Sequence, residues 1–208
     1  MSLEEIKGEY DAIFSLGHLC LAGLQLKKNQ LRPFSGVLDW MGSNSLPDVN
    51  RLLKNRFAGF MDFKNLAIRG YANEYNLLVE DEVYHIFSNH DFAADKNTLT
   101  HLAAYPEVKE KFNRRIKRFL EKMETSKRIL FVRTEGSFAD VLELESVLSD
   151  LVKHDFRILV VNHTNVQGLV EKEWPVERVA VVELPNKEIW EENDQLWKTI
   201  LSDVHLRV

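Results

Sequence analysis

The amino-acid sequence predicts an α/β protein in which a mostly parallel sheet is sandwiched between helices, as three layers. Residues 128–132, 158–161 and 179–184 are short, continuous apolar runs, which are typical of strands buried on both faces. An amphipathic helical pattern over 138–153 separates the first two runs, and this alternation favours parallel strands joined by helices. A β-branched and aromatic run at 12–14 predicts an earlier strand.

Periodicity and end signals predict the remaining helices. A helix over 19–28 ends in two lysines and Asn29, where cations suit the last turn and asparagine can adopt the left-handed conformation. Ser45 is a good N-cap for the next helix, with Pro47 in its first turn. Apolar spacing predicts two more helices, at 106–123 and 194–202.

A β-hairpin insertion is predicted near residues 75–90. Its strands would cover 76–79 and 83–89, joined through the acidic residues 80–82. His90 would then lie at the end of the second strand or just past it.

Composition limits the function. The chain has 208 residues, of which 45% are hydrophobic and 28% charged, and no linker or repeat divides it, so we expect a single domain over 1–208. The net charge of −5 disfavours nucleic acid as a partner. No apolar run approaches the ~20 residues of a membrane span, and the start of the chain has no signal-peptide pattern, so we expect a cytoplasmic protein without a membrane partner.

The most informative residue is Cys20, the one cysteine of the chain. A lone cysteine excludes an intrachain disulfide and a cysteine-rich zinc site, and neither phosphate-binding glycine motifs nor a His-Glu-x-x-His helix occurs, so we expect no metal and no cofactor. Cys20 follows the strand at 12–14, in the first turn of the helix over 19–28. The positive end of a helix favours the thiolate, which attacks carbonyl carbons. The competing interpretation is a small buried hydrophobe.

A cysteine nucleophile needs a histidine base, and a third group that orients this base. Among the seven histidines, His90 is our choice because the chain turns there and the imidazole can face a cleft. His163, in a loop at the predicted ligand edge, is the main competitor. Asp39 is our candidate to orient the base, and the Trp40 ring could cover a pocket. Glu135 and Asn162 are alternatives to Asp39.

Ligands of such sheets bind beyond the carboxyl ends of the strands. Arg133 and Glu135 follow the strand at 128–132, and Asn162 follows the strand at 158–161. Arg133 could clamp an anionic substrate group, and a structural pair of Arg133 with Glu135 is the alternative. We therefore expect Arg133, Glu135, Asn162 and Trp40 to bind the substrate.

Several short motifs occur in an order that resembles a known family. They are Ser15-Leu-Gly-His-Leu-Cys20, Leu31-Arg32 followed by Asp39-Trp40, His90-Asp91-Phe92, Arg114-Arg115-Ile-Lys-Arg-Phe119 and Ile129-Leu-Phe-Val-Arg-Thr134. Together they resemble the bacterial domain of unknown function 1796 family of papain-like cysteine peptidases. The resemblance implies that Cys20 is the nucleophile and His90 its base. Papain-like enzymes pair a helical part with a mostly antiparallel sheet, whereas the periodicity here predicts a parallel sheet.

The leading prediction is a cysteine-dependent hydrolase or acyl-transfer enzyme with a Cys20–His90 pair, acting on a peptide or a small-molecule substrate. One alternative is a non-catalytic module that binds a polar or sugar-like ligand through Arg133, Glu135 and Asn162. The other is an SGNH-esterase-like hydrolase with cysteine in place of serine, which would use a late pair, Asp203 and His205. Sequence does not determine the oligomeric state.

Overall fold

The computed structural model describes residues 1–207 and contains a central five-stranded sheet with the strand order β2-β7-β8-β10-β9. The four parallel strands are β2 (Ala12–Ser15), β7 (Arg128–Thr134), β8 (Asp155–Thr164) and β10 (Val179–Pro185). The edge strand β9 (Val170–Lys172) runs antiparallel to β10. The predicted mostly parallel sheet is therefore confirmed, and all four parallel strands lie at the predicted apolar runs.

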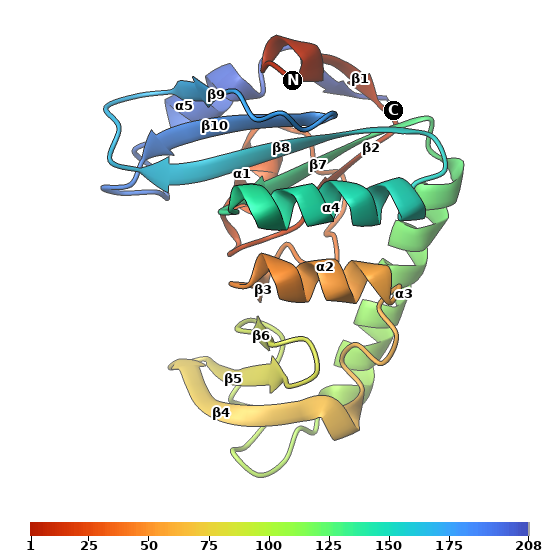
Figure 1. Ribbon diagram of the computed structural model, residues 1–208. Coiled ribbons are helices and arrows are strands. Elements are labelled where there is room, and N and C mark those ends of the chain that lie inside the picture. Colours follow the sequence, from red (N-terminus) through yellow and green to blue (C-terminus); the bar gives the residue numbers. More distant parts are fainter. Residues whose placement is uncertain (208) are drawn as a thin grey trace.

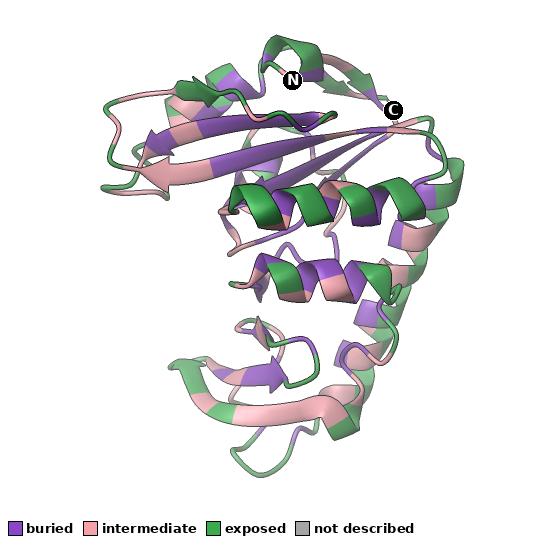
Figure 2. Ribbon diagram, in the orientation of Figure 1, coloured by how far each residue is buried: buried purple, intermediate pink, exposed green. Residues whose placement is uncertain are grey.

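Helices cover both faces of this sheet, which gives the predicted three layers (Figure 1). On one face, α4 (Phe138–Leu151) packs against the strands, and α2 (Leu46–Lys54) packs beyond it. On the other face lie α1 (Leu21–Lys28) and α5 (Asp194–Ile200). Because alternate strand residues point to opposite faces, the apolar residues of β7, β8 and β10 divide between two cores. Figure 2 shows these strands as the most continuously buried part of the chain.

A second, antiparallel sheet has the order β3-β6-β5-β4. Its strands are β3 (Met41–Gly42), β4 (Leu66–Asn73), β5 (Asn76–Asp81) and β6 (Ile86–Ser88). The hairpin near 75–90 is confirmed as β5 and β6, although the second strand is shorter than predicted because residues 82–85 form the turn.

Five strands of the described residues escape the sequence prediction: β1 (Gly8–Tyr10), β3, β4, β9 and β11 (Val204–Leu206). In β4, most residues are exposed or half-buried and the pairing with β5 shifts register twice, so no apolar alternation marks it. β3 has two residues and β9 is exposed throughout, so neither carries an apolar pattern.

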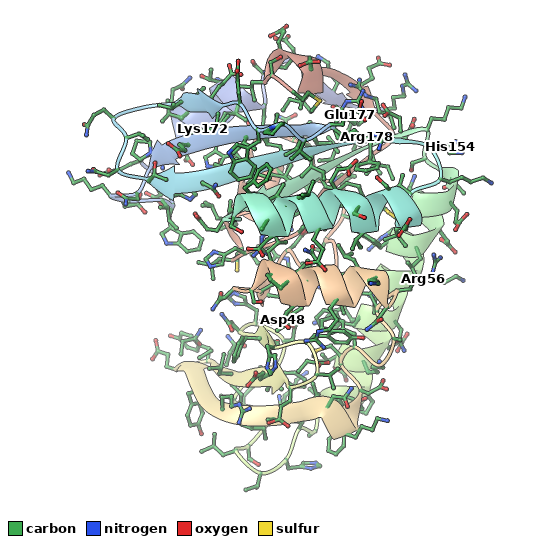
Figure 3. All side chains as sticks on the ribbon, in the orientation of Figure 1. Asp48, Arg56, His154, Lys172, Glu177 and Arg178 are labelled. Carbon is green, nitrogen blue, oxygen red and sulfur yellow. The ribbon has the colours of Figure 1, made fainter. Side chains whose placement is uncertain are left out.

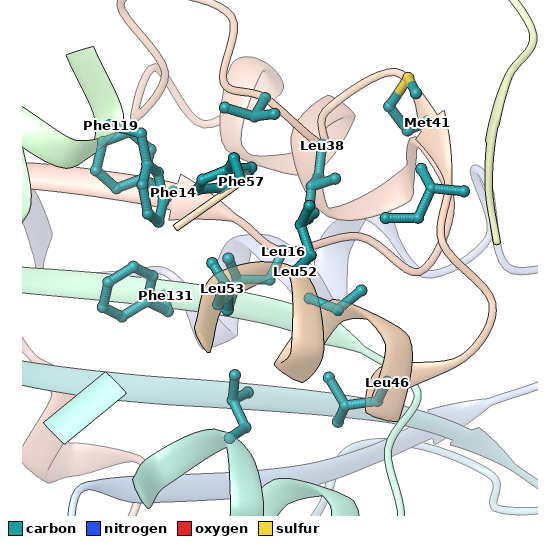
Figure 4. Packing of buried hydrophobic residues seen from close by; sticks show 14 of the residues in the cluster. Phe14, Leu16, Leu38, Met41, Leu46, Leu52, Leu53, Phe57, Phe119 and Phe131 are labelled. Atoms are coloured by element: carbon teal, nitrogen blue, oxygen red, sulfur yellow. The ribbon is translucent and has the colours of Figure 1, made fainter. Parts of the chain in front are cut away.

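The long helix α3 (Tyr105–Thr125) runs beside both sheets (Figure 1). Its Phe119 ring lies 4.8 Å from Phe14 of the main sheet and 5.2 Å from Phe57 after α2, measured between ring centroids. Two turns earlier in α3, the Phe112 ring centroid lies 5.7 Å from that of Phe60. Figure 4 shows this packing around Phe14, Phe57 and Phe119. A single apolar cluster thus includes residues of both sheets. The single domain over 1–208 stays a prediction.

Short elements complete the fold. They are the 3-10 helices η1 (Glu4–Ile6) and η2 (Phe63–Asn65), and a parallel pair formed by β1 (Gly8–Tyr10) and β11 (Val204–Leu206) near the two ends of the chain. Within residues 1–207, no helix is long and apolar enough to cross a membrane.

Local sequence signals account for the helix starts. The Ser45 hydroxyl accepts a hydrogen bond from the Asp48 N–H at 3.3 Å, and a proline stands in the first turn of α2, as predicted. Ser137 caps α4 in the same way through the Asp140 N–H.

The end of α1 differs in one residue from the prediction. The helix stops at Lys28, but Asn29 keeps a negative φ of −89°, and Gln30 adopts the left-handed conformation with a φ of 61°. The Leu31 N–H then donates to the Leu26 carbonyl at 2.8 Å, and the Gln30 N–H donates to Lys27 at 3.1 Å. This is the Schellman arrangement, in which glycine is the favoured residue at the left-handed position.

We expect Gln30→Gly to raise the free energy of unfolding by about 0.5–1 kcal/mol, because glycine adopts the left-handed conformation without steric cost. Urea unfolding followed by circular dichroism measures this change. The matched control is Lys27→Gly in the same helix, which we expect to lower stability by about 0.5–1 kcal/mol. Equal destabilisation by both substitutions would contradict the assignment of Gln30.

Candidate active site

The turn after β2 places Cys20 at the start of α1. Gly17 has a φ of +90°, and a Cβ built on it would lie 2.0 Å from Ser43 Oγ and 2.9 Å from Arg133 Nη1. Only glycine therefore fits this turn without displacement of its neighbours. Cys20 follows as the N-cap residue of α1, one position before the helix proper.

The turn after β6 places His90 opposite this cysteine. His90 Nε2 lies 3.7 Å from Cys20 Sγ, although the two residues are 70 positions apart in the chain. Asp91 anchors the turn, since its carboxylate accepts from Ser88 Oγ at 2.6 Å and pairs with Lys111 Nζ at 2.5 Å. His90 is exposed and Cys20 is half-buried, so the pair is open to solvent.

The local electrostatics of Cys20 oppose ionisation. Burial raises the pKa of the Cys20 thiol, its own main-chain N–H lowers that pKa, and the negative charge of Asp39 raises it further. The net direction is upward. Burial therefore opposes the thiolate that the N-terminus of the helix is expected to favour. A thiolate at this position depends on transfer of the proton to a base.

Asp39 lies behind the pair and is 1% exposed. Its Oδ2 accepts from Arg32 Nη1 at 2.7 Å and from the Gly36 N–H at 2.8 Å. These bonds fix the loop before β3. Its direct partners are thus Arg32 and Gly36, and its role toward the histidine stays a prediction.

Trp40 contacts the imidazole directly. The rings of Trp40 and His90 meet edge to face, with centroids 5.9 Å apart and an interplanar angle of 82°. On the Trp40 ring lies the Arg32 guanidinium, 5.0 Å from the centroid, and the indole N–H donates to Ser35 Oγ at 3.3 Å. A chain of contacts therefore runs from Asp39 through Arg32 and Trp40 to His90. The sequence analysis assigned no role to Arg32, which stands in a family motif, or to Ser35, because a loop has no periodicity that marks its side-chain pairs.

Arg133 is completely buried and bonded to protein oxygens. Its guanidinium donates to the carbonyls of Leu16, Ser43 and Glu135 at 2.8, 2.8 and 3.1 Å, and to Ser43 Oγ at 3.1 Å. Burial lowers the pKa of this guanidinium. Arg133 therefore ties the turn after β2 to the loop before α2, and contact with a substrate stays a prediction.

Glu135 and Asn162 lie at the carboxyl edge of the main sheet, as the topology predicts. The Glu135 carboxylate contacts His163 Nδ1 at 2.6 Å, and His163 Nε2 is buried with no partner among the described residues. Asn162 makes two hydrogen bonds with the main chain of Gly136, at 2.9 and 3.1 Å. Glu135 thus pairs with His163, Asn162 bonds to the neighbouring turn, and among the described residues neither bonds to Cys20.

Two other histidines of interest lie at the opposite end of the sheet. His154 stands between α4 and β8, at the amino end of that strand (Figure 3). His205 belongs to β11, which pairs with β1 directly before β2. Cys20 follows the carboxyl end of β2, so the late Asp203 and His205 do not meet the thiol. Within residues 1–207, no group of three or more His, Cys, Asp or Glu side chains is arranged to hold a metal ion.

Fold and site define the class of protein: a mixed α/β protein with a cysteine–histidine pair between a parallel and an antiparallel sheet. Residues 11–166 match the family described as "Putative papain-like cysteine peptidase (DUF1796)", and the chain belongs to this family. The matched span includes both members of the pair.

A viral protein is similar over nearly the whole chain. "Uncharacterized protein R408" of Acanthamoeba polyphaga mimivirus is 25% identical over 219 aligned positions, which cover 92% of this chain and 97% of that protein. No solved structure matches the chain.

We expect Arg133→Met to lower the free energy of unfolding by about 3 kcal/mol, because buried carbonyls that lose their donor cost about 1–3 kcal/mol each. Urea unfolding measures the loss. Arg114→Met is the matched control, since Arg114 is exposed on α3, and we expect a change within about 0.5 kcal/mol. An Arg133→Met protein as stable as wild type would contradict the anchoring role.

Proposed function

We propose that this protein is a cysteine-dependent acyl-transfer enzyme, most simply a hydrolase of peptide, amide or thioester bonds, with Cys20 as nucleophile and His90 as general base. One observation carries the proposal: Cys20 Sγ and His90 Nε2 lie 3.7 Å apart at an open surface. A nucleophile within reach of an imidazole is the arrangement that covalent acyl transfer requires.

The reaction begins with proton transfer. His90 Nε2 accepts the Cys20 proton while the sulfur attacks the carbonyl carbon, which avoids a free thiolate in a setting that raises the thiol pKa. The carbonyl becomes a tetrahedral oxyanion, and the main-chain N–H groups of Leu19 and Cys20 are the candidate donors to it. His90 then gives the proton to the leaving group, and a thioester to Cys20 remains. Water, deprotonated by His90, attacks this thioester and releases the acid and the free thiol.

Trp40 acts in this scheme as a positioning residue. Its edge-to-face contact limits rotation of the His90 ring, and the Arg32 guanidinium over the indole holds Trp40 in place. Asp39 acts through Arg32, with which it forms a buried ion pair. This differs from a carboxylate bonded directly to the imidazole.

The two alternative functions have less support. A non-catalytic module would leave Cys20 as a packing residue far from His90, whereas the two are within 3.7 Å. An esterase-like arrangement would bring His205 to Cys20, whereas β11 lies at the other end of the sheet.

The pH dependence of Cys20 alkylation by iodoacetamide tests the pair, and the single cysteine makes the labelling unambiguous. In His90→Ala, the raised thiol pKa keeps the sulfur protonated at pH 7, and the rate should rise only as the pH exceeds about 8.5, the ordinary value for a thiol. In wild type, His90 accepts the proton, so we expect a rate at pH 7 about 10- to 100-fold higher than in His90→Ala.

His101→Ala is the matched control, because His101 is an exposed histidine of the loop before α3. It should reproduce the wild-type profile. Superimposable pH profiles for wild type and His90→Ala would refute the proposed role of His90.

Trp40 gives a separate prediction. We expect Trp40→Ala to lower the neutral-pH alkylation rate about 10-fold by freeing the His90 ring, and Trp40→Phe to keep most of it, because a phenyl ring can retain the edge-to-face contact. The shape of the pH profile distinguishes this effect from general destabilisation, which would leave the profile unchanged. Equal rates in the two variants would contradict a positioning role for Trp40.

A further inference from the structure

A group of cationic side chains borders the Cys20–His90 pair on the side of α3. Lys111, Arg115 and Arg118 lie on one face of this helix, since residues spaced by three and four share a face. Lys111 pairs with Asp91, the neighbour of His90. Arg118 donates to the Ser35 carbonyl at 3.2 Å, and the Ser35 hydroxyl holds Trp40.

Arg115 stands between these two contacts and therefore faces the segments that carry His90 and Trp40. It is half-buried, and its Nη1 is buried with no hydrogen-bond partner among the described residues. Asp91 and Asp39 are the acidic groups that act on its charge, which agrees with this position.

The nearby carboxylates are already occupied. Both oxygens of Asp91 are engaged, one by Lys111 and one by Ser88. Asp39 is paired with Arg32, whose side chain is 7% exposed and whose own Nε lacks a partner. Cations thus outnumber carboxylates beside the pair, and two guanidinium groups keep unused donors.

Unused buried donors are costly, and guanidinium groups match the oxygens of a carboxylate or phosphate. We propose that the Arg115 side of the Cys20–His90 site recognises an anionic group of the substrate, a carboxylate or a phosphoryl group close to the bond that is cleaved. This inference rests on the proposed function, because it names the class of substrate for the same pair.

Two alkylating reagents test this inference. Iodoacetate and iodoacetamide form the same thioether bond with Cys20 and release iodide, and they differ in that iodoacetate is an anion. The ratio of their rates, divided by the ratio for a cysteine-containing peptide in solution, corrects for the intrinsic reactivity of the thiol. We expect wild type to favour iodoacetate about fivefold at physiological salt.

Arg115→Gln should remove most of this preference, and Arg115→Lys should keep part of it. The control Arg114→Gln removes an exposed arginine of the neighbouring face and should leave the ratio within about twofold of wild type, because charges at the surface are screened. Urea midpoints establish that each variant is folded. A second readout is protection of Cys20 from iodoacetamide by inorganic phosphate, which we expect in wild type and not in Arg115→Gln.

A wild-type ratio equal to that of the free peptide, or an unchanged ratio in Arg115→Gln, would overturn the anion site. Neither result tests the role of His90, which is measured by the pH dependence of alkylation with iodoacetamide. The anion site and the catalytic pair can therefore fail separately.

Discussion

The contact between Cys20 and His90 depends on an apolar core that extends from one sheet to the other. Cys20 follows a strand of the main parallel sheet, and His90 follows a strand of the small antiparallel sheet. Neither sheet contains both residues, so the geometry of the pair is set by how the sheets pack. The aromatic contacts of Phe119 with Phe14 and Phe57 fix α3 against the first sheet, and Phe112 fixes it near the second. Close packing of this kind tolerates little displacement.

Buried charged side chains fix the loops that lie on this apolar core. Arg133 donates to three carbonyls in three loops, and the Arg32–Asp39 pair fixes the loop that carries Trp40. Such groups are expensive to bury, and hydrogen bonds to the surrounding protein offset part of that cost. Burial of Cys20 itself raises the pKa of its thiol. The site therefore combines a half-buried sulfur with an exposed imidazole.

Much of the main sheet could be predicted because its signals are local. The apolar runs of β7, β8 and β10 and the cap at Ser45 need no knowledge of distant residues. The strand β4 could not be predicted, since it is stabilised by pairing with β5 and has no apolar pattern of its own. The left-handed residue at the end of α1 was displaced by one position, from Asn29 to Gln30, because the Schellman hydrogen bonds decide it.

The residues of the site also divide into those that local signals predict and those that only the tertiary structure reveals. Cys20 and His90 could be chosen from their places at the ends of strands, supported by the family motifs. The contacts around Asp39 could not be predicted, because Arg32 reaches both Asp39 and the Trp40 ring from a loop of irregular conformation. The upward shift of the Cys20 pKa also escapes the sequence, since it results from tertiary burial. The cysteine-before-histidine order fits a papain-like enzyme, whereas Cys20 here follows a strand of a mostly parallel sheet.

The most direct test of catalysis is a search for an acyl adduct on Cys20. Wild-type protein is mixed with peptide thioesters, some of which carry a carboxylate near the reacting bond, and is analysed by intact-mass and peptide mass spectrometry after rapid acid quenching. The proposed mechanism predicts turnover with a transient acyl adduct on Cys20, and loss of turnover in Cys20→Ala and in His90→Ala. Turnover that persists in Cys20→Ala would contradict it.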